Sequence, residues 1–481
     1  MKIAVIGAGP AGLIAGNMLA KNKQHDVVVY EKAKRVAPVA DQSIINGNIY
    51  DLSTVYIPNI HWDGKGPMPE FKELLDEFGV KTIPATWWTD DNDLAQSGFY
   101  WDTRSGKNLP FTKVIEEEGY TVADMVQQSM KAVELYSSVQ GIRTVQECLK
   151  LDIVEPFETH RQWADRHGIS LIADLQKRVY GDFGIGDIND LPAAQVMMMG
   201  NDKHTSGLAY RLYGLMKTGY VRREQMSERC KIWMDFIEEE GVDHFLCIVE
   251  DGYRSFFDAI VRESHFQLKK NECITRLDIN SESEGKIRIS SSRGCEDFDK
   301  VIISSRPQDS IKFLDPGLES HKYLSQVTSN SVYQLSLVVG DGYPLPLGKS
   351  WMYPGPFGNE KNAEKDQSVV GTVYRYGDGI LVVDIQTSPD IAGTKLQDEK
   401  TIQELSKMGM KNIRILESHV YPHTPSHLSV NSVAEGWYDK FEELQGKHNL
   451  YYLGELFTGH GVTNTCIGTQ SMIKEFFPEM K

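Results

Sequence analysis

The chain has 481 residues, a formal net charge of −16 and a hydrophobic fraction of 41%. This length allows two or three cores of ordinary size, and we expect no membrane span because no segment holds the roughly 18 apolar residues that a span needs. The negative charge argues against nucleic acid as a partner, and six cysteines without Cys-x-x-Cys spacing predict a cytoplasmic protein with neither a disulfide scaffold nor a bound metal.

The first predicted element is a buried strand over residues 3–6, which is followed by a glycine-rich turn and by apolar residues at helical spacing. The turn has the spacing Gly-x-Gly-x-x-Gly and consists of Gly7, Gly9, Pro10, Ala11 and Gly12. In such a motif the first glycine permits the turn, the second lets a pyrophosphate approach the backbone, and the third lets helix pack on strand. We therefore expect the pyrophosphate of a dinucleotide at the N-terminus of this helix.

The second predicted strand, "DVVVYE", ends at Glu31 and is followed by Lys32. In such folds an acid about 20 residues after the glycine turn accepts hydrogen bonds from the adenosine ribose. Its negative charge argues against a 2′-phosphate, and hence against NADP. Both residues are therefore predicted to contact the cofactor. This motif alone leaves both NAD and FAD open.

The middle of the chain divides into a helical and a strand-rich region. Residues 101–240 are predicted to be mostly helical, with Thr121 as the N-cap of one helix, "VADMVQQSMKAVELYSS". Residues 311–430 alternate as strands do, for example in "SVYQLSLVV" and "GILVVDIQT".

A second turn of glycine and acid stands near the C-terminus in "LYYLGELFTGHGVTNTCIG", residues 450–468. Its candidate cofactor contacts are Gly454, Glu455, Gly461, Val462 and Thr463. A nicotinamide dehydrogenase has no need to bring the end of its chain back to the cofactor, whereas the long, extended FAD molecule does. The helix that follows would direct its N-terminus at the flavin edge that gains negative charge on reduction. FAD is therefore the predicted cofactor.

With both turns, the chain resembles the FAD-dependent amine-oxidase superfamily over nearly its whole length. The other similar segments are "VEDGYRSFFDAI" (249–260), "ECITRLDIN" (272–280) and "FDKVIISSRP" (298–307). The resemblance implies an α/β fold, in which a Rossmann-like FAD-binding domain is assembled from discontinuous segments and joined by an α+β substrate domain. It assigns residues 1–100, 241–310 and 431–481 to FAD, residues 101–240 and 311–430 to the substrate, and a backbone contact with adenine to Ile274.

Within the superfamily, the chain is similar to flavin-dependent polyenoic fatty acid isomerases. The similar segments are "FGIGDINDLPAAQV" (183–196), the glycine turn at 251–252 and "ESHVYPHTPSHLSVNSVAEGWYDKFEELQGKHNLYYLGE" (417–455). This implies a small, apolar, unsaturated substrate from which the flavin takes a hydride and to which it returns the hydride at another carbon. Two alternatives stay open: an oxidase or desaturase that passes electrons to oxygen, and a protein of this fold that binds without catalysis.

The sequence also departs from the superfamily. Ala37-Pro38-Val39 replaces a Gly-Gly-basic run, and Lys34 or Arg35 is the candidate substitute for the lost cation. Ser53, which we expect with Thr54 and Val55 near the flavin, stands where a glycine is common. The strand that often carries a lysine near the flavin has Tyr333 and Gln334 instead. Neither the catalytic residues nor the oligomeric state follows from these patterns.

Overall fold

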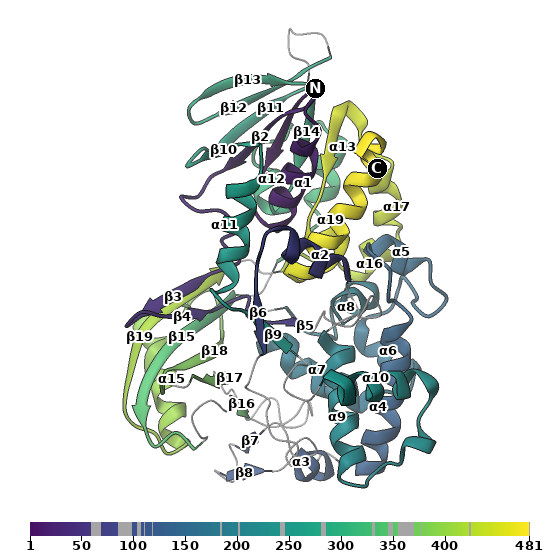
Figure 1. Cartoon of the computed structure of the whole chain (residues 1–481), viewed down its shortest axis with the longest axis vertical. Helices are drawn as coiled ribbons and strands as arrows, with labels where there is room; N and C mark the ends of the chain where they lie inside the picture. Colours follow the sequence, from purple (N-terminus) through teal and green to yellow (C-terminus); the bar gives the residue numbers. More distant parts are fainter. Residues whose placement is uncertain are drawn as a thin grey trace.

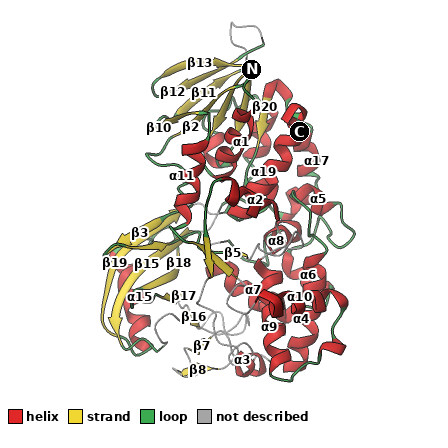
Figure 2. Ribbon diagram, viewed as in Figure 1, coloured by secondary structure: helices red, strands yellow, loops and turns green. Residues whose placement is uncertain are grey.

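The computed structural model describes residues 1–58, 69–84, 99–102, 107–109, 111–117, 119–182, 185–200, 203–240, 246–279, 285–329, 332–344, 350–354, 370–376, 378–422 and 425–480. Its upper part holds both termini, and its lower part has a sheet on one side and a group of helices on the other (Figure 1). The separation of strands from helices in the lower part is plain in Figure 2.

A five-stranded sheet forms the centre of the upper part, and all of its pairings are parallel. Its strands, in order across the sheet, are β10 (Gln267–Lys270), β2 (Asp26–Glu31), β1 (Lys2–Ile6), β14 (Lys300–Ile303) and β20 (Leu450–Tyr452). In the middle strand, Ile3, Ala4 and Val5 are fully buried, as expected for a strand covered on both faces. The sheet therefore joins three distant segments of the chain, and the predicted Rossmann-like α/β fold is confirmed.

Helices from the same three segments pack beside this sheet. The longest are α1 (Pro10–Lys21), α11 (Tyr253–Glu263) and α19 (Val462–Phe476), and α1 packs against the other two. Helix α11 is capped from outside, because the Asp51 carboxylate accepts the Tyr253 N–H at 2.9 Å. The other helices of this part are α2 (Pro69–Glu77), α12 (Pro307–Ser310), α13 (Glu319–Leu324), α16 (Val430–Ala434), α17 (Trp437–Glu442) and α18 (Glu455–Thr458), with short 3₁₀ turns at Lys447–Asn449 and Pro478–Met480.

Three small sheets accompany the central one. One is antiparallel and consists of β11 (Ile274–Asp278), β12 (Ile287–Ser291) and β13 (Gly294–Phe298). The hairpin β3 (Gln42–Ile45) and β4 (Asn48–Asp51) forms the second. The third joins β9 (Leu246–Val249) to β5 (Ile57–Pro58) and β6 (Thr82–Pro84).

The sheet side of the lower part has seven strands. In order these are β19 (Lys411–Pro422), β15 (Val332–Asp341), β18 (Leu381–Thr387), β17 (Val370–Arg375), β16 (Ser350–Pro354), β7 (Phe99–Asp102) and β8 (Lys107–Leu109), with α15 (Lys395–Lys407) packed on the sheet. The strands of the region 311–430 appear as predicted. Strands β7 and β8 were not predicted, because residues 101–240 read as mostly helical and the described part of that region becomes helical only from Phe111.

The helical side of the lower part is built from the segment that follows β8. Its helices are α3 (Phe111–Glu117), α4 (Val122–Ser137), α5 (Val145–Leu149), α6 (His160–Arg166), α7 (Ser170–Asp182), α8 (Ala193–Gly200), α9 (Lys203–Lys217) and α10 (Glu228–Glu240), with a 3₁₀ turn at Arg223–Gln225. Thr121 caps α4 as predicted, since its side chain accepts the N–H of Asp124. Helix α4 packs against α7, α9 and α10 and so forms the centre of this group.

Candidate cofactor site

The central sheet brings four chain segments to one edge. Because its strands are parallel, the residues after β1, β2, β14 and β20 all leave at the same edge. These residues begin with Gly7, Lys32, Ser304 and Leu453. The chain passes from β1 through α1 to β2 on one side, while β14 lies on the other, so the strand order reverses here. A ligand of such a sheet binds in the crevice at this reversal.

The glycine turn after β1 has the geometry that its spacing predicts. Gly7 adopts a φ of 105° and donates its N–H to the Tyr30 carbonyl at 2.8 Å. A Cβ on Gly12 would lie 1.8 Å from the Gly7 carbonyl oxygen, so this helix can approach the strand only with glycine. Around Gly9 the space that a Cβ would fill is open. Pro10 and Ala11 then form the first turn of α1.

Glu31 ends β2 as a buried carboxylate beside this turn. It accepts the N–H of Ala8 at 2.9 Å and that of Ala33 at 2.8 Å. Each carboxylate oxygen keeps a further lone pair, so Glu31 can still accept hydrogen bonds from a ribose. Lys32 is exposed, and its ammonium group lies 2.8 Å from Asp309.

The start of β11 lies against the end of β2. The N–H of Asn271 donates to the Ala33 carbonyl at 3.1 Å, and that of Glu272 donates to the Glu31 carbonyl at 3.0 Å. These bonds bring Ile274, the first residue of β11, to the side of the crevice at which the adenosine is expected.

The space beside the glycines of the second turn is open, as it is beside Gly9. Gly454 and Gly461 have φ values of 126° and 113°, and no atom lies within 4 Å of a Cβ built on either. Gly461 precedes α19, whose first residues, Val462 and Thr463, are buried. The glycine turns from opposite ends of the chain thus leave free space where an extended dinucleotide would approach the backbone, so these residues fit FAD.

Glu455 is held within the second turn. It accepts the N–H of Ser426 at 3.1 Å, and the other carboxylate oxygen lies 3.0 Å from Nδ1 of His460. Burial would raise the pKa of Glu455, but the hydrogen bond and charge of His460 hold that pKa below its usual value. Glu455 is therefore a fixed carboxylate at the β20 end of the crevice.

The two departures from the superfamily pattern meet at Val39. Its carbonyl accepts the hydroxyl groups of Ser53 and of Thr54, the latter at 3.1 Å. Val55, the third predicted residue of this segment, is half-buried. Ala37 takes a φ of 41° and donates its N–H to the Ala8 carbonyl at 2.7 Å. The segment is thus tied to the glycine turn despite Pro38.

Of the two predicted substitutes for the lost cation, Arg35 is already paired within the protein. The guanidinium of Arg35 lies 2.5 Å from Asp41, and the Lys34 side chain is exposed. Asp41 also binds His419 at 2.9 Å and Tyr421 at 2.8 Å, both on β19. We call Arg35, Asp41, His419 and Tyr421 the Asp41 cluster. The sequence analysis missed it because its members are far apart in the chain.

The strand that lacks a lysine, β15, carries the buried Tyr333, whose ring packs near the half-buried Tyr421 of β19. The Tyr333 hydroxyl donates to Asp384 at 2.9 Å, and its ring centre lies 5.7 Å from that of Tyr421. Gln334 accepts the N–H of Gly393 at 2.8 Å. Sequence reasoning missed Asp384, although a single acid in the apolar run "LVVDIQT" is a signal for a buried, hydrogen-bonded carboxylate.

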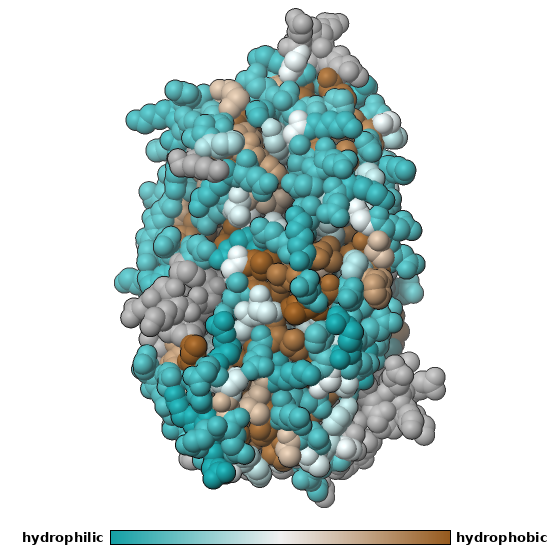
Figure 3. Space-filling model, turned by 90° about the vertical axis from the view of Figure 1, so that its right-hand side faces the viewer, coloured by the Kyte–Doolittle hydropathy of each residue, from teal (hydrophilic) through white to brown (hydrophobic). Residues whose placement is uncertain are grey.

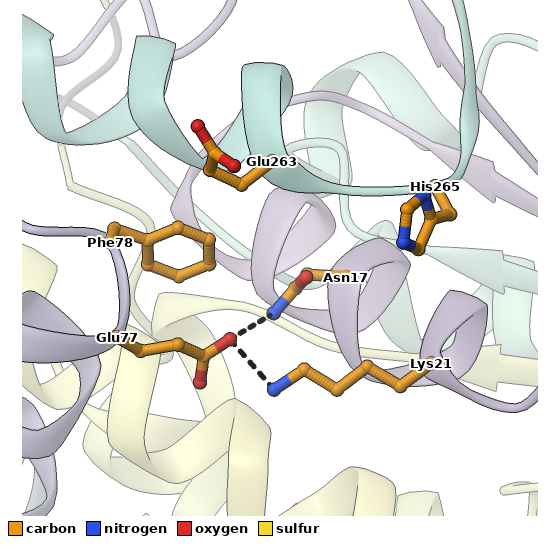
Figure 4. A pocket seen from close by; sticks show the side chains of 6 residues that line it. All are labelled: Asn17, Lys21, Glu77, Phe78, Glu263 and His265. Carbon is orange, nitrogen blue, oxygen red and sulfur yellow. Dashed lines mark hydrogen bonds and ion pairs between the residues drawn. The ribbon is translucent and has the colours of Figure 1, made fainter.

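A cavity of charged character lies at the opposite end of α1. It is lined by Asn17, Lys21, Glu77, Phe78, Glu263 and His265 (Figure 4). Glu77 there pairs with Lys21 at 2.7 Å and accepts from Asn17 at 3.5 Å. The site is therefore separate from the glycine turn. Within the described ranges we find no group of His, Cys, Asp and Glu arranged to hold a metal, and none of the described helices could span a bilayer.

Comparisons with known proteins agree with this architecture. Residues 5–78 match the family model of an NAD(P)-binding Rossmann-like domain, a motif that NAD and FAD enzymes share. A CLA-producing fatty acid isomerase from P. acnes has the same fold, with a TM-score of 0.73, 19% identity and coverage of 99% of this chain and 98% of that one. The match extends over nearly the whole of both chains, so the two proteins share their fold from end to end.

Other solved structures share this fold. Putrescine oxidase bound to putrescine gives a TM-score of 0.66 with 12% identity, and 99% of each chain is covered. An oxidoreductase from Methanosarcina mazei gives 0.58 with 15% identity over 98% of this chain and 100% of that one. No curated protein matches by sequence. These likenesses establish the fold of the chain.

Proposed function

We propose that this protein is an FAD-dependent enzyme that isomerises double bonds in a polyunsaturated fatty acid or a similar apolar, unsaturated substrate. The observation that carries the proposal is the meeting of the two open glycine turns at one edge of the central sheet. When bound, the flavin would accept a hydride from the substrate and return it at another carbon.

The protein's own groups would bind and orient the cofactor. The N–H groups of the first turn of α1, which begin after Pro10 because proline has none, would hold the pyrophosphate, and Glu31 would accept the ribose hydroxyls. The N-terminus of α19, at Val462 and Thr463, would stabilise negative charge on the flavin. Such chemistry needs no strong acid or base from the chain, so position and exclusion of water are what the residues supply.

Two observations favour isomerisation over amine oxidation. The β15 strand has Tyr333 and Gln334 where amine oxidases often carry a lysine, and the hydroxyl of Tyr333 is already bound to Asp384. The fold of a fatty acid isomerase also gives a higher TM-score, 0.73, than that of putrescine oxidase, 0.66. Figure 3 shows apolar residues at mid-height on the face that it draws, between hydrophilic regions above and below.

The alternative is an oxidase or desaturase that passes electrons to oxygen. It is supported by the equally complete match to the fold of putrescine oxidase. It also agrees with the single dinucleotide motif in the sequence, because that motif leaves no separate site for a nicotinamide reductant.

An anaerobic absorption spectrum of the purified protein with linoleic acid distinguishes these functions. A conjugated-diene band that grows while the flavin bands persist is the result expected for isomerisation. Flavin bands that bleach until air is admitted would show net oxidation and favour the alternative. Persistent flavin bands without a diene would remove this fatty acid as the substrate, and a colourless protein that takes up no FAD would overturn both functions.

A further inference from the structure

The second glycine turn presents one small open patch in a segment that is otherwise buried. Of residues 450–469, all are buried except for four that are partly exposed, namely Gly454, Glu455, His460 and Gly461. No atom lies within 4 Å of a Cβ built on either glycine. The side chains that the patch offers to a ligand are therefore those of Glu455 and His460, which are 31% and 30% exposed.

His460 is held in place from behind this patch. A Cβ on the preceding residue, Gly459, would lie 2.6 Å from Cβ of Met198, so the turn rests directly on α8. The Asn464 side chain donates to the carbonyl groups of Met198, at 2.8 Å, and of His460, at 3.2 Å. The His460 ring is fixed in turn by Glu455, which lies 3.0 Å from Nδ1. The imidazole is thus anchored at both its backbone and one ring nitrogen.

The pairing with Glu455 determines which ring nitrogen of His460 is left for a ligand. Burial would raise the pKa of Glu455, but the hydrogen bond and charge of His460, with smaller contributions from Ser426 and Arg306, hold that pKa below its usual value. A carboxylate only accepts hydrogen bonds, so the proton of this pair is on Nδ1 of His460. Among the described residues no group binds Nε2, which is therefore the ring atom open to a ligand.

The place of His460 along the sheet selects the flavin half of the dinucleotide. The pyrophosphate is expected at the turn after β1, and the adenosine ribose beside Glu31 at the end of β2, on one side of that turn. His460 follows β20, which stands two strands from β1 on the other side. Since neighbouring strands are about 4.8 Å apart, β20 lies about 10 Å from β1. An extended dinucleotide with its adenosine at β2 would therefore bring its flavin half to His460.

We propose that His460 binds the ribityl chain of the flavin through Nε2, and that Glu455 is the residue that positions the ring. A ribityl hydroxyl both donates and accepts, so it can pair with Nε2 in either protonation state of the imidazole, whereas a phosphate oxygen only accepts. The inference rests on the proposed function, since it names a contact of the same cofactor. It predicts that His460 contributes to the binding of FAD but not to that of ADP, which lacks the ribityl chain.

The test compares FAD with ADP on protein freed of flavin. FAD binding is measured by flavin fluorescence and ADP binding by calorimetry, for the wild type, His460→Phe and His460→Gln. We expect His460→Phe to weaken FAD binding on the order of tenfold, because a hydrogen bond is lost, while ADP affinity stays within about twofold. His460→Gln should recover part of the loss, since its amide can donate to Glu455 and still pair with a hydroxyl.

Deoxy-FAD analogues that each lack one ribityl hydroxyl identify the contact. One of them should bind the wild type and His460→Phe with affinities within about twofold of each other, because the partner of Nε2 is already absent. His265→Gln, in the separate cavity at the opposite end of α1, is the matched control and should bind FAD as the wild type does. Equal losses of FAD and ADP affinity in His460→Phe, no loss at all, or the same loss with every deoxy analogue would overturn the role of His460. Wild-type protein that binds no FAD would instead overturn the proposed function, on which that role rests.

Discussion

At the scale of single residues, Gly9 and Gly12 belong to one motif in the turn after β1, but each is required for a different physical reason. Gly12 is required by packing, because a Cβ there would lie 1.8 Å from a backbone oxygen. Gly9 meets no such contact, and its φ of −77° suits any residue. We attribute its glycine to a ligand that approaches the backbone.

Substitution of each glycine by alanine should separate the two demands. Gly12→Ala should lower the unfolding free energy by about 1–3 kcal/mol, as overpacking does, and should weaken FAD binding as well. Gly9→Ala should leave thermal unfolding of the flavin-free protein unchanged while it weakens FAD binding at least about tenfold. Differential scanning fluorimetry and flavin fluorescence measure the two effects. Normal FAD affinity in Gly9→Ala would contradict the assignment of the open space to the cofactor.

At the scale of elements, the start of α11 depends on a residue from another part of the chain. Asp51, on β4, accepts the Tyr253 N–H with both carboxylate oxygens, at 3.0 and 2.9 Å. Burial raises the pKa of Asp51 from 3.8 to about 7, and the backbone bond and the nearby Arg254 only partly oppose it. The folded state therefore favours the protonated form of this buried capping acid.

This preference sets a direction for stability against pH. Between pH 3.8 and about 7 the folded protein keeps the Asp51 proton that the unfolded chain releases. The unfolding free energy should therefore fall as pH rises through that interval. In Asp51→Asn, which retains the cap without titrating, this component of the slope should disappear. Chemical denaturation at several pH values measures it, and an unchanged slope would contradict the raised pKa.

The elements that could be predicted are those whose signal is local. The glycine turns, the acid of Glu31 and the cap at Thr121 are each specified by residues a few positions apart. Strands β7 and β8 were missed because they are short and because β7 pairs with β16, far along the chain, while β8 pairs with β7.

At the scale of the whole molecule, the Asp41 cluster connects the upper part to the seven-stranded sheet. Arg35 and Asp41 come from the first segment, and His419 and Tyr421 from β19. Hydrogen bonding to Asp41 raises the pKa of His419 above its usual value, so the folded state favours the charged form of this histidine. The contact is thus an ionic link between two layers of the molecule.

Removal of this carboxylate should weaken the link and its response to pH. Asp41→Asn should lower the unfolding free energy by about 1–3 kcal/mol near pH 6, because the charge that pairs with Arg35 and His419 is lost and an NH2 group replaces one of the two accepting oxygens. The contribution of His419 is fully present below about pH 6.5 and is lost as pH rises through its raised folded pKa. As the pH rises above about 6.5, the unfolding free energy of the variant should therefore decrease less than that of the wild type. Asp76→Asn, in an exposed pair with Lys72, should behave as the wild type does.

The central sheet imposes an order on biosynthesis. Ribosomes add about 5–20 residues per second from the N-terminus, so β1 and β2 are complete long before β20 and α19 have been translated. Until then β14 is an edge strand with unpaired backbone groups, which can pair with other chains. A nascent or truncated polypeptide thus has one glycine turn without the other and an aggregation-prone edge. We therefore expect the proposed cofactor to load after translation, and holdase chaperones to bind the unclosed sheet.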